Sequence, residues 1–151
     1  MAILFLGDDM KTNQEMLSSI LKTTQMGQIG IRSVLNASAS PAMEQALRSQ
    51  LQEYDAIEQQ AQTIAGAKGW HLRELDPGVR FMSNMMARMK LSYNCSDSKI
   101  AAMMVQGNTR GVVKGLKNIH HFKNRDPQIT ELSQKLLDCE NQNIRQMEGF
   151  L

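Results

Sequence analysis

The stretch DPQITELSQKLLDCENQNIRQMEGFL, residues 126–151, decides the fold class of this chain. It opens with Asp126 and Pro127, an N-cap residue followed by a proline at the first helical position, where a missing backbone N–H costs nothing. Its spacing predicts an amphipathic helix over 127–150. The residues of the expected inward face recur every three or four positions: Ile129, Leu132, Leu136, Glu140, Asn143, Met147 and Leu151.

Three further helix starts carry similar signals. Ser40 precedes Pro41 and Asp76 precedes Pro77, while Thr12 and Glu15 have the spacing of a capping box. These starts predict helices over 13–36, 41–66 and 77–122. No segment of comparable length alternates between apolar and polar residues with a period of two, so the expected fold class is all-α. Two inward stripes support the first two helices: Leu17, Ile20, Leu21, Thr24, Gln28, Ile31, Leu35, and Met43, Leu47, Gln50, Tyr54, Ile57, Ala61, Ile64.

The third predicted helix, 77–122, is the irregular one, because it would be about 69 Å long against about 36 to 39 Å for the others. Its stripe runs in phase from Met82 through Met103 to Gly107, which favours one continuous or kinked helix. The sequence NCSDS at 94–98 leaves open a break, since Ser96 and Asp97 are good N-caps. In that case a helix over 97–122 follows a crossover, 67–96, that contains a short Met-rich helix.

Four helices with short connections at both hairpins predict an antiparallel four-helix bundle, in a single domain over 1–151. A chain of 151 residues can bury roughly 70% of its unfolded surface, so no disulfide or metal is needed for stability.

Its two cysteines form no C-x-x-C pair, the opening MAILFL is too short for a signal peptide, and no apolar run reaches membrane-spanning length. We therefore expect a cytoplasmic protein.

Several inward polar residues fall near the middle of the expected bundle. Glu140 carries the one sure carboxylate of this layer, and a buried carboxylate needs a partner. We expect Tyr54 or Gln50 to donate a hydrogen bond to it, with Gly107 and Gly111 opposite leaving space for water or for close helix contact. The layer consists of Thr24, Gln28, Gln50, Tyr54, Glu140 and Asn143, with Glu58 at its margin.

This arrangement resembles the ferritin-like superfamily, whose di-iron site lies at mid-bundle and uses a Glu from two helices and Glu-x-x-His from the other two. In this chain Glu140 stands at the glutamate position of the last helix, and Asn143 stands where its histidine would be. Glu53 is followed three residues later by Ala56 instead of histidine. The chain's histidines, His71, His120 and His121, all lie near expected helix ends or in a loop.

The resemblance therefore implies a ferritin-like bundle whose di-metal site is not intact. We expect a non-enzymatic structural or protein-interaction role without a cofactor, for which spore-coat-like bundle proteins of the superfamily offer an analogy. Neither Cys139 nor Cys95 has a histidine within helical reach, so no nucleophilic catalytic residue is predicted. The alternative is an iron- or manganese-binding protein with a reduced site built from Glu140, Asn143, Glu58, Gln28 and Gln50.

Two other patterns concern partners. The run FMSNMMARM at 81–89 places Met82, Met85, Met86 and Met89 on one helix face, which favours a homodimer interface over a Cu(I) site.

Residues 79–125 carry nine basic side chains against one acid, Asp97, although the whole chain has a net charge of only +2. A basic helix can bind nucleic acid or another anionic partner. Pairing with the acidic second and fourth helices explains the same pattern, and no DNA-binding motif accompanies it.

Overall fold

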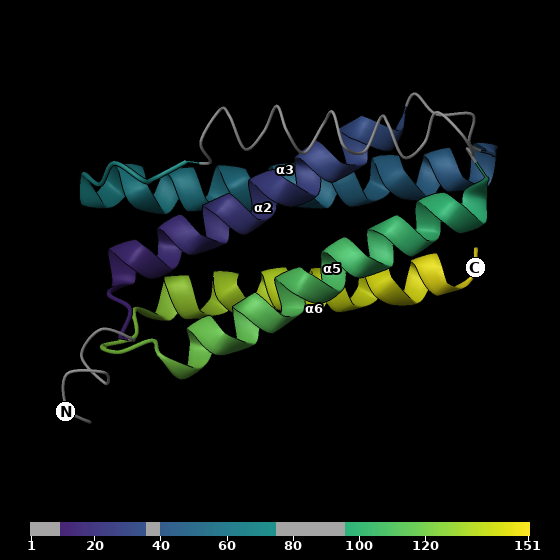
Figure 1. Cartoon of the computed structure of the whole chain (residues 1–151). Coiled ribbons are helices and arrows are strands. Elements are labelled where there is room, and N and C mark those ends of the chain that lie inside the picture. The colour runs from purple at the N-terminus through teal and green to yellow at the C-terminus, as the bar shows by residue number, and fades with distance from the viewer. Residues whose placement is uncertain (1–9, 36–39, 75–95) are drawn as a thin grey trace.

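The computed structural model describes residues 10–35, 40–74 and 96–151, and these residues form four helices (Figure 1). They are α2 (Asn13–Leu35), α3 (Pro41–Lys68), α5 (Asp97–His120) and α6 (Pro127–Glu148). The predicted all-α, four-helix bundle with antiparallel neighbours is confirmed. None of the described helices combines the length and the apolar character that crossing a membrane requires.

Three of the predicted helix starts are present with their capping bonds. At α2 the Thr12 hydroxyl accepts from the Glu15 N–H, and the Glu15 carboxylate accepts from the Thr12 N–H, which completes the capping box. Ser40 caps α3 and Asp126 caps α6, each directly before a proline. The start expected at Asp76 and Pro77 lies outside the described residues.

The continuous helix expected over 77–122 is wrong, and the alternative break within NCSDS is correct. Ser96 is extended, with φ −66° and ψ 149°, and its hydroxyl accepts the Lys99 N–H, so α5 begins at Asp97. Ser96 and Asp97 compete for backbone hydrogen bonds and so favour a helix start over a helix interior. The expected crossover helix and the interface residues Met82, Met85, Met86 and Met89 lie outside the described residues.

The four helices form two hairpins, α2 with α3 and α5 with α6, which pack against each other (Figure 1). Helices α3 and α5 run in the same direction, so α5 begins at the end of the bundle opposite to the end of α3. As a result, α2 packs antiparallel to α3 and α5, and α6 packs antiparallel to α3 and α5. This topology is that of bundles with one long crossover connection.

Polar contacts tie the two hairpins together at both ends. At one end the Lys11 N–H donates to the His121 carbonyl over 2.8 Å, and Lys68 pairs with Asp126 over 2.9 Å. At the other end Ser40 donates both its N–H and its hydroxyl to the carboxylate of Asp97, over 3.0 and 2.5 Å. These contacts hold the α2–α3 hairpin against the α5–α6 hairpin, and the cavity described below lies between α2 and α5.

The inward stripes predicted for α2, α3 and α6 form the core up to their last members: Leu35 and Ile64 are partly buried against it, and Leu151 is exposed. In α5 the stripe expected through Met103 and Gly107 is displaced by one residue, because Met104 and Asn108 are the buried side chains. Met103 and Gly107 were expected to face inward because they continue the helical spacing that begins at Met82, on the assumption of one continuous helix. Since the helix starts anew at Asp97, α5 can take its own rotation.

The double role of Ser40 makes it a sensitive point for stability. Ser40→Ala removes the cap of α3 and the hydroxyl that binds Asp97, so we expect the free energy of unfolding to fall by about 1–2 kcal/mol. Urea unfolding followed by circular dichroism measures this. Ser49→Ala, an exposed position within the same helix, is the matched control. Equal stability of the two variants would contradict the assigned role of Ser40.

Candidate functional site

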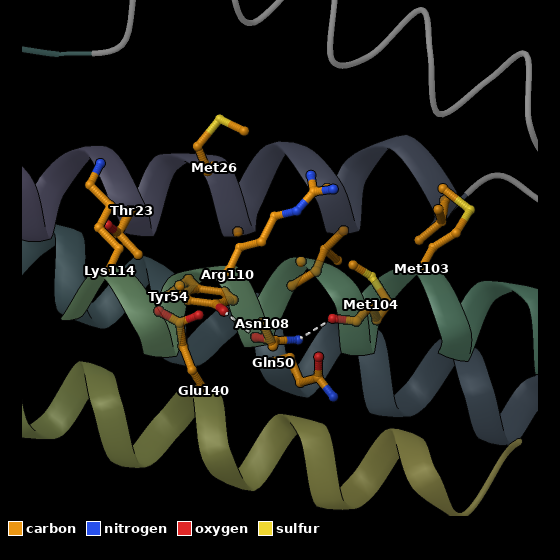
Figure 2. Close-up of a pocket in the computed structure, with 16 residues that line it drawn as sticks. Thr23, Met26, Gln50, Tyr54, Met103, Met104, Asn108, Arg110, Lys114 and Glu140 are labelled. Atoms are coloured by element: carbon orange, nitrogen blue, oxygen red, sulfur yellow. Dashed lines mark hydrogen bonds between the residues drawn. The ribbon is translucent and has the colours of Figure 1, made fainter. Parts of the chain in front are cut away.

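A cavity of about 280 Å³ lies between α2 and α5 (Figure 2). Helices α3 and α6 close it from below with Gln50, Tyr54 and Glu140. One wall comes from α2 and consists of Thr23, Met26, Gly27, Gly30, Ile31 and Val34. The other comes from α5 and consists of Met103, Met104, Gly107, Asn108, Arg110, Gly111 and Lys114.

Glycines in both walls make room for side chains from the floor. A Cβ at Gly27 would stand 2.5 Å from Cζ of Tyr54, so the tyrosine ring lies directly against the α2 backbone. A Cβ at Gly111 would overlap the carboxyl group of Glu140. Gly107 differs, because no atom lies within 4 Å of the place where its Cβ would be. The first two glycines thus allow close contact, whereas Gly107 borders empty space.

Tyr54 belongs to a buried hydrogen-bond chain between α3 and α5. Its hydroxyl donates to Oδ1 of Asn108 over 2.8 Å, and Nδ2 of Asn108 donates to the Met104 carbonyl over 2.8 Å (Figure 2). Burial raises the pKa of Tyr54 well above its ordinary value, and the nearby Glu140 raises it further. Tyr54 is therefore a neutral donor, but its acceptor is Asn108, so the expected bond from Tyr54 to Glu140 is wrong.

Only one end of the Gln50 side-chain amide makes a hydrogen bond. Its Nε2 donates to Oε1 of Gln146 over 2.8 Å, which makes the expected bond from Gln50 to Glu140 wrong as well. Its own Oε1 is buried without a hydrogen-bond partner. Buried polar atoms usually have a partner, so an open acceptor beside a cavity is unusual.

Glu140 is the second unsatisfied group at the cavity. Its residue is only 3% exposed, and its carboxyl makes no hydrogen bond or ion pair with the described residues. Figure 2 shows it reaching from α6 to a place beneath α5, next to Tyr54. Burial disfavours the charged carboxylate and raises the pKa of Glu140 to about 8. At neutral pH the group is thus mostly a carboxylic acid, which can donate a hydrogen bond.

The structure does not bring the five candidate metal ligands together. Gln50 and Glu140 line the cavity, but Gln28 and Glu58 line a separate one beside α2 and α3. There Gln28 donates to Asp55 over 2.8 Å. Asn143 is buried, with Nδ2 3.8 Å from Sγ of Cys139.

The remaining member of the predicted polar layer, Thr24, donates its hydroxyl to the Ile20 carbonyl of its own helix. In residues 10–35, 40–74 and 96–151 there is no group of three or more His, Cys, Asp or Glu side chains that could hold a metal ion.

Cys139 is a buried thiol that packs beside the polar layer. Its Sγ donates to Oε2 of Glu53 over 3.1 Å. Burial, followed by the bond to Glu53, raises the pKa of the Cys139 thiol far above its ordinary value. The group therefore stays protonated, which does not favour nucleophilic chemistry.

Arg110 and Lys114 bring positive charge to the cavity from α5, one helical turn apart, and Figure 2 shows both extending toward α2. The ion pairs in the described part of the chain are Arg32–Asp55, Arg48–Glu44 and Lys68–Asp126, so neither cation has an acidic partner there. Burial lowers the pKa of Lys114, and the charges of Lys22 and Lys11 lower it further. The expected pairing of this basic helix with acidic helices is not made at these two positions.

The sequence reasoning missed Asn108, Arg110 and Lys114 as cavity residues. A signal for Asn108 was present, since Ile100, Met104, Asn108 and Gly111 also have helical spacing, one residue out of phase with the stripe we chose. Which stripe faces inward depends on how α5 is rotated in the bundle.

Comparison with protein-family models, curated proteins and solved structures finds no match to this chain.

The two kinds of glycine in α5 predict opposite effects of alanine. Gly111→Ala should lower the free energy of unfolding by about 1–3 kcal/mol, because the added Cβ displaces Glu140. Gly107→Ala should raise it by up to about 1 kcal/mol, since the methyl group enters open space and alanine favours the helix. Urea unfolding of both variants measures the difference. A stabilising Gly111→Ala would show that Glu140 does not lie against α5.

The shifted pKa of Glu140 predicts how stability depends on pH. The carboxyl titrates near 4.5 in the unfolded chain and at about 8 in the folded protein. Between these values the folded state keeps a proton that the unfolded state loses, so the free energy of unfolding falls as pH rises. The slope from this group is at most about 1.4 kcal/mol per pH unit.

Glu140→Gln provides the comparison, because the amide stays neutral at every pH. The wild-type stability should decline relative to the variant from about pH 5 to about pH 8, and the two curves should run parallel outside that interval. Urea unfolding at a series of pH values gives both curves. If they run parallel throughout, Glu140 is not a buried acid.

Proposed function

We propose that this protein is a non-enzymatic, ferritin-like helical bundle with a structural or protein-interaction role and without an intact di-iron site. Its topology supports the ferritin-like assignment, since two antiparallel hairpins joined by one long crossover are typical of that architecture. A shared architecture does not carry a shared activity, so the functional part of the proposal depends on the side chains at mid-bundle.

The observation that carries the proposal is the isolation of Glu140. A ferritin-like di-metal centre uses four glutamates and two histidines that converge between the helices. Here Glu140 is accompanied in the cavity by Tyr54, Gln50 and Asn108, which are neutral. Amide oxygens are weak ligands for iron or manganese when they must replace carboxylate and imidazole.

The other acids of α3 are engaged elsewhere. Glu53 accepts from Cys139, Asp55 accepts from Gln28 and pairs with Arg32, and Glu58 lines the separate cavity beside α2 and α3. The bond from Gln28 to Asp55 occupies a candidate ligand that a metal site would have to release. This competition further supports a protein without a di-metal centre.

The alternative, an iron- or manganese-binding protein with a reduced site, has one observation in its favour. The carboxyl of Glu140 and Oε1 of Gln50 both lack partners and line the same cavity. A single cation there would have one carboxylate and neutral oxygen donors, with Arg110 and Lys114 nearby to oppose its charge.

Metal analysis separates the two functions. We expect the purified full-length chain to contain no stoichiometric metal, and Fe(II) or Mn(II) added under anaerobic calorimetry to bind no more tightly than to Glu140→Ala. Glu131→Ala, which removes an exposed acid of the same helix, is the matched control. Stoichiometric metal that is lost in Glu140→Ala and retained in Glu131→Ala would overturn the proposal.

The proposed interaction role includes a homodimer in the cytoplasm. Val113 and Leu116 of α5 are 47% and 45% exposed, and they supply an apolar surface among the described residues. The methionine run at 81–89, which the sequence suggests as an interface, lies outside those residues. Sedimentation equilibrium of the same preparation gives the molecular mass, and a monomer at micromolar concentration would exclude the dimer.

A further inference from the structure

We propose that the cavity between α2 and α5 binds a small amphipathic carboxylate, an aliphatic chain that ends in a single carboxylate group. The chain lies at the end lined by Ile31, Val34, Met103 and Met104, and the carboxylate lies at the end lined by Arg110, Lys114 and Glu140. This site goes beyond the proposed function and does not depend on the absence of a metal centre.

The chain end is apolar and has room. Met103 and Met104 of α5 lie away from Glu140 and Lys114 (Figure 2), and Ile31 and Val34 of α2 line the same cavity. The empty space beside Gly107 continues this end, since no atom lies within 4 Å of a Cβ built there. Methionine side chains adapt to irregular apolar shapes, which suits a flexible aliphatic chain.

The head end carries unpaired positive charge. Arg110 and Lys114 have no acidic partner among the described residues, and both extend across the mouth of the cavity toward α2. Lys114 also lines a second cavity together with Lys11 and Lys22. Lys114 lies on the side of Glu140, and Arg110 extends toward the middle of the cavity mouth (Figure 2). Cations beside a cavity with apolar walls attract an anionic group.

Beneath the two cations, Glu140 supplies an unused hydrogen-bonding group. It is 3% exposed, has no partner in the described part of the chain and lies against Gly111, so its carboxyl is held at the cavity. As a carboxylic acid it can donate to a ligand carboxylate. The unpartnered Oε1 of Gln50 can accept from a water molecule that enters with the head group.

The two cations favour an anionic head group over a cationic or neutral one. Their charge can balance a carboxylate or a phosphate monoester, and the carboxylate is favoured by its smaller size, because it leaves more of the cavity to the chain. An ammonium group could pair with Glu140 but would meet the repulsion of Arg110 and Lys114. The volume of about 280 Å³ lies at the lower limit for ligand pockets, which restricts the occupant to a short chain.

Isothermal titration of the full-length chain with sodium octanoate, below its micellar concentration, tests the head group. Octylammonium, 1-octanol and octyl phosphate are the comparison probes with the same chain. We expect octanoate to bind in a one-to-one complex, about tenfold or more tightly than each of the others. No binding of octanoate, or equal or tighter binding of any comparison probe, would overturn the proposal.

Two matched pairs of variants locate the site. Lys114→Met should weaken octanoate binding about tenfold, while Lys117→Met, an exposed position of α5 three residues beyond Lys114 and outside the cavity lining, should leave it unchanged. Gly107→Leu should fill the cavity and abolish binding, while Gly66→Leu, at an open position of α3, should not.

Each result bears on the site directly. Full binding by Lys114→Met, or loss of binding by Lys117→Met to the same degree, would place the octanoate elsewhere. The lysine pair alters the surface only and keeps the test decisive even if Gly107→Leu fails to fold. Because metal content is measured on a different sample and does not enter these titrations, the failure of one proposal is distinguishable from the failure of the other.

Discussion

The contact between the Tyr54 ring and the α2 backbone at Gly27 determines the interior of this bundle. Because residue 27 has no side chain, the ring can lie against the helix and its hydroxyl can reach Asn108 on α5. One side chain therefore links α3 to both of the helices that form the cavity. Glu140 uses Gly111 in the same way from the opposite hairpin. Tyr54 and Glu140 thus each pack against a glycine of the neighbouring helix, and both side chains line the cavity between α2 and α5.

This arrangement leaves polar groups in an interior that would otherwise be apolar. Tyr54 and Asn108 satisfy each other, but Gln50 retains an open acceptor and Glu140 has no partner within the described residues. A buried network with unsatisfied members destabilises a fold compared with a fully bonded one. A bound ligand or water molecule that hydrogen-bonds to Gln50 and Glu140 would remove this cost. Among residues 10–35, 40–74 and 96–151 no carboxylates and imidazoles converge, and Arg110 and Lys114 have no acidic partner there, which favours an anionic organic occupant over a metal ion.

The fold places part of the basic segment of the sequence at cavities. Among the described residues, the basic side chains of α5 make no ion pair with the acids of α3 and α6. Asp55 pairs with α2, Glu44 and Asp138 bond within their own helices, and Glu53 accepts from Cys139. Arg110 and Lys114 instead lie at the mouth of the cavity, close to the end where Lys11 and Lys22 add their charges. The charge pattern that at the sequence level suggested an anionic partner thus coincides with a cavity large enough for a small one.

The sequence by itself determined the fold class and the helix starts at Thr12, Ser40 and Asp126, because caps, first-turn prolines and apolar periodicity act within a few neighbouring residues. It also determined that Glu140 and Tyr54 face inward. The break at Ser96 was legible in NCSDS, but the in-phase stripe from Met82 outweighed it in our prediction. Only the tertiary structure decided that Tyr54 bonds Asn108, that Gln50 bonds Gln146, and that Arg110 and Lys114 join Glu140 at one cavity. These choices depend on the rotation and axial position of α5 against the other helices. A shift of one residue turns a helical side chain by about 100°, so no local pattern could settle them.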